Sequence, residues 1–371
     1  MISPYTIAVP QTAIDDLKAR LTRVRWTNEL SAVGIAYGVP LSPIKRLVKY
    51  WQEDYDWRSW EAKLNAYPQF TTTIDGQNIH FLHVRSEEDN ALPLILTHGW
   101  PMSVVDYLNL IDPLTDPRSH GGEAAQAFHL VIPSLPGFGF SGPTTERGWD
   151  RYRVARAWAE LMRRLGYDRY GAHGMDWGSI VSPEVGRCDP EHVIGVHVTQ
   201  IFSGPSGDPA ELDALSEQEK KQWQAFQWWS EHKGAYNPLQ STVPQTLAFA
   251  LADSPVGQLA WTYQIYGDTL SFDYILTNVM IYWLTNTAAS SARFYYENAH
   301  AQKVPTEPTT IPLGLANFAD DNQAIRLFAE RDHKNIVSWH MYDRGSHFAT
   351  QTAPDLLIND LRTFFEQLRE R

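Results

Sequence analysis

Residues 174–178, Gly-Met-Asp-Trp-Gly, decide how the rest of this sequence is interpreted. They end a short strand-like run that begins at Tyr170, and they precede a predicted helix that begins near Ser179. A nucleophile at such a strand-to-helix turn forms a nucleophile elbow, whose strained backbone requires small residues two positions before and after it. Asp176 takes the nucleophile's place, where lipases and esterases have serine. The alternative interpretation is a glycine-rich turn in which Asp176 only caps the helix.

Strand-like and helical segments alternate on both sides of this turn. The apolar runs typical of buried strands are 92–98, 128–135, 170–176, 193–200, 311–318 and 335–342. Helices are predicted over 150–167, capped by Asp150, and over 354–369. The alternation predicts the α/β class, with a mostly parallel sheet flanked by helices. A hairpin is predicted at Asp75-Gly76, which lies between two alternating runs.

Two segments depart from the alternation. Near the N-terminus, residues 11–25 have a helical pattern that includes Val24, and a second helix is predicted to begin with Ser42 as its N-cap. From about 205 to 300 the chain is helical and rich in aromatic residues, and such an insertion can cover the strand ends where α/β sheets bind ligands. The predicted organisation is an N-terminal extension over 1–75, a core in two parts over 76–204 and 305–371, and a helical lid over 205–304.

Composition and charge exclude several classes of protein. Among the 371 residues, 43 are acidic and 31 are Lys or Arg, and the resulting net charge of −12 argues against nucleic-acid binding. The 14 tryptophans suggest large apolar surfaces or an apolar pocket. The single cysteine, Cys188, cannot form an internal disulfide.

No signal peptide, membrane anchor or membrane span is evident, so we expect a cytoplasmic protein. Its oligomeric state, with a homodimer among the options, stays open.

Two backbone N–H groups are candidates for an oxyanion hole. The sequence His98-Gly99-Trp100-Pro101 directly follows LPLILT (92–97) in the first of the strand-like runs. In this architecture the loop after that strand supplies one donor, and the residue after the nucleophile supplies the other. The predicted donors are therefore the N–H groups of Trp100 and Trp177. An ordinary turn would also explain the first of these sequences.

A histidine and an acid follow in the expected chain order of nucleophile, acid and histidine. His347 comes after the last strand-like run, and Asp320 or Asp321 comes after the run 311–318. An acid at this place orients the imidazole and stabilises its charged form. The other carboxylate would be a helix cap or a solvated group, and most of the thirteen histidines are expected to be structural.

The chain resembles, over nearly its whole length, the epoxide hydrolases of the microsomal type in their soluble bacterial form. N-terminal sequences such as YTIAVP, LTRVRWTNEL and YGVPL are similar to that family's N-terminal domain. Further similar motifs are HGWP (98–101), PSLPGFGFSG (133–142), GMDWGS (174–179), DSPVG (253–257), ILTNVMIYW (275–283) and RFYYEN (293–298). The resemblance implies an α/β-hydrolase fold with a helical lid and an N-terminal extension. It also implies conversion of an epoxide to a vicinal diol without metal or organic cofactor.

The resemblance implies roles for the nucleophile, the base and the acid. Asp176 would be the nucleophile and His347 the general base, although the family's Gly-Gly-His-Phe reads Gly-Ser-His-Phe here. The family's Phe-Pro-x-Glu/Asp motif reads Phe318-Ala319-Asp320-Asp321. This match selects Asp321 as the acid, but the missing proline keeps Asp320 in consideration.

Two lid tyrosines bind the epoxide oxygen in the family. The matching positions are Tyr236, counted back from DSPVG, and Tyr295 in RFYYEN, with Tyr296 as a weaker alternative. Without the resemblance, plain aromatic packing would explain each of these side chains.

These residues suit attack on a saturated epoxide carbon. A carboxylate such as Asp176 is already ionised near neutral pH, and two phenols can donate hydrogen bonds to the leaving oxygen. His347, held by Asp321, would then activate water to hydrolyse the ester. A haloalkane-type dehalogenase with the same nucleophile, and a binding protein that retains the fold, are the alternatives. We expect a small apolar epoxide as substrate, with detoxifying and biosynthetic roles equally open.

Overall fold

The computed structural model describes residues 1–302 and 304–369. Lys303, near the end of the predicted lid, and residues 370–371, the last two of the predicted core, lie outside the described residues.

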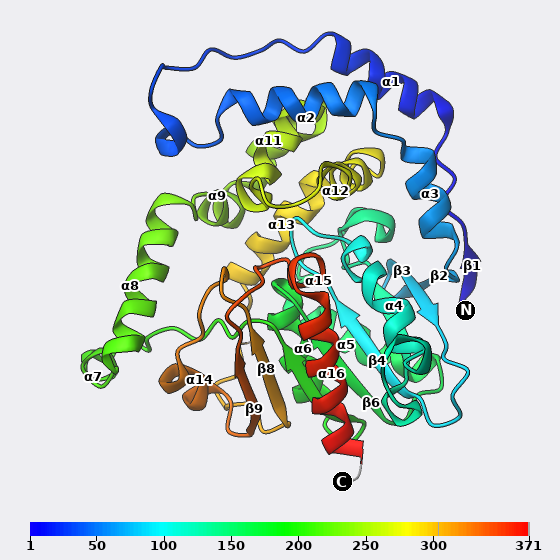
Figure 1. Ribbon diagram of the computed structural model, residues 1–371, viewed down its shortest axis with the longest axis vertical. Coiled ribbons are helices and arrows are strands. Elements are labelled where there is room, and N and C mark those ends of the chain that lie inside the picture. Colours follow the sequence, from blue (N-terminus) through cyan, green and yellow to red (C-terminus); the bar gives the residue numbers. More distant parts are fainter. Residues whose placement is uncertain (303, 370–371) are drawn as a thin grey trace.

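A single sheet forms the centre of the molecule (Figure 1). Within the described residues its strand order is β1-β2-β3-β5-β4-β6-β7-β8-β9. The strands are β1 (Ser3–Tyr5), β2 (Gln69–Ile74), β3 (Gln77–Val84), β4 (Leu92–Thr97), β5 (Phe128–Pro133), β6 (Tyr170–Gly174), β7 (Val193–Val198), β8 (Leu313–Asn317) and β9 (Ile336–Met341). The pairs β1–β2, β2–β3 and β3–β5 are antiparallel. The remaining neighbours in this order, from β5 through β4 to β9, are parallel. The predicted mostly parallel sheet is therefore confirmed.

Helices cover both faces of this sheet. One face carries α4 (Leu108–Thr115) and α16 (Pro354–Arg369), and the other carries α5 (Arg151–Arg164) and α6 (Trp177–Cys188). Alternation along β4 divides the core: Leu94 and Leu96 join the cluster that contains Phe364, whereas Ile95 joins the cluster that contains Trp158. Two short helices, α14 (Arg326–Asp332) and α15 (Ala349–Thr352), follow β8 and β9. The helix predicted over 354–369 and the Asp150 cap of α5 are confirmed.

The N-terminal segment contributes three helices and a hairpin. The helices are α1 (Gln11–Thr22), α2 (Leu41–Glu53) and α3 (Trp57–Asn65), and α1 and α2 lie across α11 and α12 (Figure 1). The hairpin prediction is confirmed, because Asp75 and Gly76 form the two-residue turn between β2 and β3 with positive φ. Two details were wrong. Val24 lies beyond the end of α1, and Pro40, not Ser42, is the N-cap of α2.

The long segment between β7 and β8 folds as helices. These are α7 (Pro209–Asp213), α8 (Glu217–His232), α9 (Tyr236–Thr242), α10 (Pro244–Asp253), α11 (Pro255–Tyr266), α12 (Phe272–Leu284) and α13 (Ala288–Ala299). Short 3₁₀ turns elsewhere cover Gly34–Tyr37, Val104–Tyr107, Arg118–His120, Ala124–Gln126 and Gly139–Ser141. No helix in the described part of the chain is long and apolar enough to cross a bilayer.

The turn between β6 and α6 has the strained geometry that the sequence predicts. Asp176 has φ 52° and ψ −119°, a region that residues with a Cβ atom rarely adopt. A Cβ atom at Gly174 would lie 1.9 Å from the carbonyl oxygen of Gly178, and one at Gly178 would lie 1.8 Å from that of Thr97. Only glycine therefore fits at either position.

The substitution Gly178→Ala should destabilise the protein, because the new methyl group would meet the Thr97 carbonyl. We expect a loss of about 3 kcal/mol in the free energy of unfolding, at the upper end of overpacking costs. Urea titration followed by fluorescence measures this loss. Gly204→Ala is the matched control, since nothing lies within 4 Å of a Cβ atom there. Equal unfolding midpoints for the two variants would contradict the steric argument.

Candidate active site

The Asp176 side chain lies at the carboxyl end of the sheet, next to the loop that follows β4. The strands β4 and β6 are parallel neighbours, so the residues after each of them meet at one edge. The backbone N–H of Trp100 donates a hydrogen bond to Asp176 Oδ1 at 2.7 Å. This close approach requires glycine at position 99, because a Cβ atom there would lie 2.0 Å from the same oxygen. The loop after β4 thus supplies a backbone donor at the place that the sequence predicts.

The second predicted donor is the backbone N–H of Trp177. Trp177 is the first residue of α6, so its N–H has no partner within the helix. The hydrogen bonds of the described residues include none from this group to Asp176. Its part in an oxyanion hole stays a prediction.

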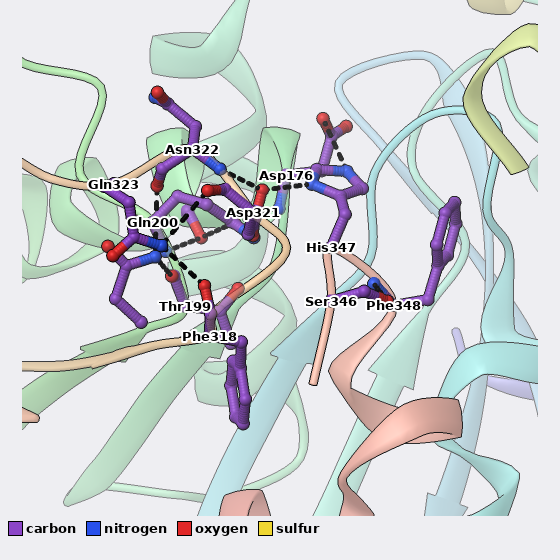
Figure 2. A network of polar contacts seen from close by, with 12 residues as sticks. Asp176, Thr199, Gln200, Phe318, Asp321, Asn322, Gln323, Ser346, His347 and Phe348 are labelled. Carbon is purple, nitrogen blue, oxygen red and sulfur yellow. Dashed lines mark hydrogen bonds and ion pairs between the residues drawn. The ribbon is translucent and has the colours of Figure 1, made fainter. Parts of the chain in front are cut away.

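His347 lies between two carboxylates, as Figure 2 shows. Its Nδ1 is 3.0 Å from Asp321 Oδ1, and its Nε2 is 3.5 Å from Asp176 Oδ2. Asp321 and His347 come from the loops after β8 and β9, which adjoin each other in the sheet. The Asp321 side chain is only 4% exposed, whereas Asp320 is an exposed residue whose backbone N–H donates to the Gly345 carbonyl. The geometry therefore favours Asp321 over Asp320 as the partner of His347.

Opposing influences act on the protonation of His347. Burial lowers the pKa of His347, but the Asp321 and Asp176 carboxylates raise it and outweigh burial. The net effect places the pKa of His347 well above its usual range. The imidazolium form of the ring is therefore favoured near neutral pH.

Gln200 joins Asp176 to Asp321, and the sequence motifs do not reveal it. This buried residue lies just beyond β7, after Thr199, and Figure 2 shows its amide beside Asp321. Its Oε1 accepts a hydrogen bond from the backbone N–H of Asp176 at 2.8 Å, and its Nε2 donates to Asp321 Oδ2. A single glutamine after a strand belongs to no motif. The one signal available was its place at the end of the predicted strand 193–200.

Two tyrosines lie with two tryptophans in one aromatic cluster. Tyr236 stacks on Trp100 with ring centroids 5.2 Å apart, and Tyr295 meets the rings of Trp100 and Trp177 edge to face. Both tyrosines are buried, and the ring centroids of Tyr236 and Tyr295 are themselves 6.0 Å apart. Tyr296 is 38% exposed and stacks on His300 instead. The structure thus brings Tyr236 and Tyr295 to the site, and it does not bring Tyr296 there.

Burial keeps both of these phenols protonated. It raises the pKa of Tyr236, and the Asp176 and Asp321 carboxylates raise this pKa further. Burial likewise raises the pKa of Tyr295 well above its usual range. Both hydroxyl groups are therefore hydrogen-bond donors throughout the physiological pH range.

His98, the first residue of the HGWP motif, has a structural position. It is fully buried, and its Nε2 accepts a hydrogen bond from the backbone N–H of Leu135 in the loop after β5. Burial lowers the pKa of His98 to about 4, so the ring is neutral. Among the described residues no group of three or more His, Cys, Asp or Glu side chains is arranged to hold a metal ion. The absence of a metal or organic cofactor stays a prediction.

Comparisons with known proteins agree with this arrangement. Residues 2–107 match the family described as "Epoxide hydrolase N terminus", and residues 93–232 match the "alpha/beta hydrolase fold" family. A protein of Stigmatella aurantiaca (strain DW4/3-1) that carries a provisional epoxide hydrolase name is 44% identical over 100% of this chain and 86% of its own length. Epoxide hydrolase 1 of Sus scrofa is 31% identical over 100% of this chain and 90% of its own.

Solved structures give the same result. The epoxide hydrolase of Aspergillus niger superposes with a TM-score of 0.87 at 29% identity, covering 99% of this chain and 97% of that one. The juvenile hormone epoxide hydrolase of the silkworm Bombyx mori superposes with a TM-score of 0.89 at 26% identity, covering 100% and 95%. The predicted α/β-hydrolase fold and the predicted family are both confirmed. This chain therefore belongs to the epoxide hydrolase family.

Proposed function

We propose that this protein converts a small apolar epoxide to a vicinal diol through a covalent ester on Asp176. The observation that carries the proposal is the placement of His347 between the carboxylates of Asp176 and Asp321. Two buried phenols pack on Trp100, whose backbone N–H holds Asp176. In this proposal Asp176, Asp321 and His347 act as a catalytic triad. The cluster of tryptophan and tyrosine rings beside Asp176 supports an apolar substrate.

The first step is a displacement at a ring carbon of the epoxide. Asp176 Oδ1 is held by the N–H of Trp100, so Oδ2 is the oxygen that attacks. The C–O bond of the epoxide breaks as the ester bond forms, and negative charge develops on the leaving oxygen. Tyr236 and Tyr295 donate hydrogen bonds to that oxygen, and one of the two phenols gives it a proton. The imidazolium of His347, no longer facing a charged Asp176, then returns a proton to this phenolate and becomes the neutral base of the second step. The product of the first step is a hydroxyalkyl ester on Asp176.

The second step is hydrolysis of this ester. His347 takes a proton from water, which attacks the Asp176 carbonyl carbon, and Asp321 stabilises the imidazolium that forms. The tetrahedral intermediate carries its negative charge on Oδ1, where the N–H of Trp100 already points. We propose the N–H of Trp177 as the second donor. Collapse of the intermediate breaks the Cγ–Oδ2 bond, and the leaving oxygen takes the remaining proton of the attacking water. The diol departs with Oδ2, the oxygen of water stays on the restored Asp176 carboxylate, and His347 is again an imidazolium.

We also propose that residues 205–304 form a lid that closes over the site and that residues 1–75 form an extension attached to it. The positions of Tyr236 on α9 and Tyr295 on α13 support the lid, because both belong to the helical segment and both reach Trp100. The homodimer named above as an option stays a prediction.

The covalent ester is the first testable consequence. A single turnover of a styrene-type epoxide in heavy-oxygen water should place the label in Asp176, and His347→Gln should accumulate the ester as added protein mass. Mass spectrometry of the Asp176 peptide measures both results. A matched haloalkane should give no halide. Label that passes directly into the diol, with no adduct in His347→Gln, would exclude the covalent route.

Loss of the two phenols should slow ester formation. The double variant Tyr236→Phe, Tyr295→Phe keeps the rings but removes both donors, and we expect ester formation to fall about 100-fold or more. Rapid quench and mass spectrometry give this rate, and tryptophan fluorescence with the diol product checks binding. Tyr296→Phe is the control and should react at the native rate. An unchanged rate in the double variant would refute the role as acid.

The charge of Asp176 should set the protonation of His347. Asp176→Asn removes one of the two carboxylates that raise the pKa of His347, so this pKa should fall by about 1 pH unit or more. NMR titration of the imidazole measures it, with the signal assigned by its loss in His347→Gln. Asp320→Asn removes an exposed neighbouring charge and should leave the titration unchanged. A pKa of His347 that stays constant or rises in Asp176→Asn would contradict the ion pair.

A further inference from the structure

We propose that Gln200 is a positioning residue for hydrolysis of the ester. It holds Asp321, and through Asp321 the His347 ring, in a fixed position relative to Asp176. This inference rests on the proposed function and adds to it a residue that neither the sequence motifs nor the expected roles include. Gln200 itself touches no reacting atom. It acts through the acid on one side and through the nucleophile's backbone on the other.

The amide of Gln200 connects three elements of the site. Its Oε1 accepts hydrogen bonds from the Asp176 backbone N–H at 2.8 Å and from the Ser179 hydroxyl at 2.9 Å. Its Nε2 donates to Asp321 Oδ2. Gln200 is fully buried, and its own backbone N–H donates to Ser179 Oγ at 3.3 Å. One side chain therefore ties the elbow, the start of α6 and the loop after β8 together.

These partners fix which way the amide points. A flipped amide would set the Nε2 hydrogens against the Asp176 N–H and would set Oε1 against the Asp321 carboxylate. Both contacts would be repulsive. The site thus needs an acceptor toward the elbow and a donor toward the acid, and among uncharged side chains an amide provides both.

The donor half of the amide completes the hydrogen bonding of Asp321. Asp321 Oδ1 receives the backbone N–H of Asn322 at 2.7 Å and faces His347 Nδ1 at 3.0 Å. Gln200 is the donor to the other oxygen, Oδ2. Removal of this donor would leave a buried carboxylate oxygen unsatisfied, and the carboxylate would rotate to find another partner. Such a rotation would also turn the oxygen that holds His347.

The two chemical steps depend on this contact to different extents. Ester formation uses the carboxylate of Asp176 and the phenols, and it needs no base. Ester hydrolysis needs His347 as a correctly aimed neutral base. Loss of the Gln200 amide should therefore slow hydrolysis of the ester much more than its formation.

The test separates the two steps in single turnovers, with ester formation and ester decay followed by quench and mass spectrometry. Gln200→Met keeps the length of the side chain and removes both polar groups. We expect ester decay to slow about 10- to 100-fold, as for other residues that orient a catalytic group, while ester formation changes by less than about threefold. Gln258→Met is the matched control, because Gln258 is equally buried but bonds to Val279 O on α12.

Gln200→Glu provides a readout that a purely structural role would not move. When protonated, the new carboxyl presents an acceptor to the Asp176 N–H and a donor to Asp321 Oδ2, as the amide does. When ionised, it repels Asp321. Its ester decay, relative to the native enzyme at the same pH, should recover as the pH falls.

Several outcomes would overturn the inference. Native ester decay in a folded Gln200→Met variant would do so, and so would equal slowing of both steps. If Gln200→Met does not fold, a Gln200→Glu variant whose relative decay rate is independent of pH would also overturn it. Failure of the proposed function is distinguishable, because the native enzyme would then form no ester on Asp176.

Discussion

The backbone conformation of Asp176 is the constraint on which the rest of the site depends. A residue with a Cβ atom at φ 52° and ψ −119° costs about 1–3 kcal/mol, and this cost persists only where the surroundings hold the turn. Three contacts hold it: the Gln200 amide on the Asp176 N–H, the Trp100 N–H on the carboxylate, and the glycine backbones at 174 and 178 that let β6 and α6 approach. This conformation directs the Asp176 carboxylate away from the edge of the sheet. The Trp100 N–H and His347 both contact it there.

The helix α12 connects the N-terminal segment to the loop that carries the Trp100 donor. On one side, N-terminal side chains reach α12: Tyr50 bonds Asp273, Tyr55 bonds Thr277 and the Trp51 indole lies 3.3 Å from the sulfur of Met280. On the other side, α12 reaches the loop after β4: Tyr274 bonds Asp106, Asn278 bonds Ser103 and Tyr282 bonds the Met102 carbonyl. Much of the aromatic surplus in the composition therefore serves to dock these layers together. The position of the Trp100 N–H therefore depends on a segment far from it in the sequence.

Local patterns allowed most of the fold to be predicted, because a strand, a helix or a hairpin turn is set by residues close in sequence. The errors are local too. Ser42 lies inside the first turn of α2, where N–H groups need no helical partner and a proline is tolerated. The helix can therefore begin at Leu41 with Pro40 as its N-cap. The preference for Asp321 over Asp320 as the partner of His347 required the structure. Adjacent side chains point in different directions, and the proline of the family motif is missing. The proposed role of Gln200 could not be predicted from the sequence, because it depends on β7 lying between β6 and β8, and no short motif encodes strand order.

The electrostatics around His347 suit the proposed mechanism, in which ester formation changes the charge of Asp176. In the resting state the Asp176 and Asp321 carboxylates favour the imidazolium, and ester formation removes the charge of Asp176 alone. The ring then holds its proton less strongly, at the moment when a neutral base is required. A third carboxyl group, Asp106, lies within electrostatic reach of His347 and is fully buried. Burial raises the pKa of Asp106 to about 7, although hydrogen bonds from Tyr274 and the Ser103 N–H lower it, so it carries only part of a charge near neutral pH. A full charge on Asp106 would oppose proton release by His347. In the proposed mechanism its raised pKa leaves Asp176 as the carboxylate whose change of charge releases the base.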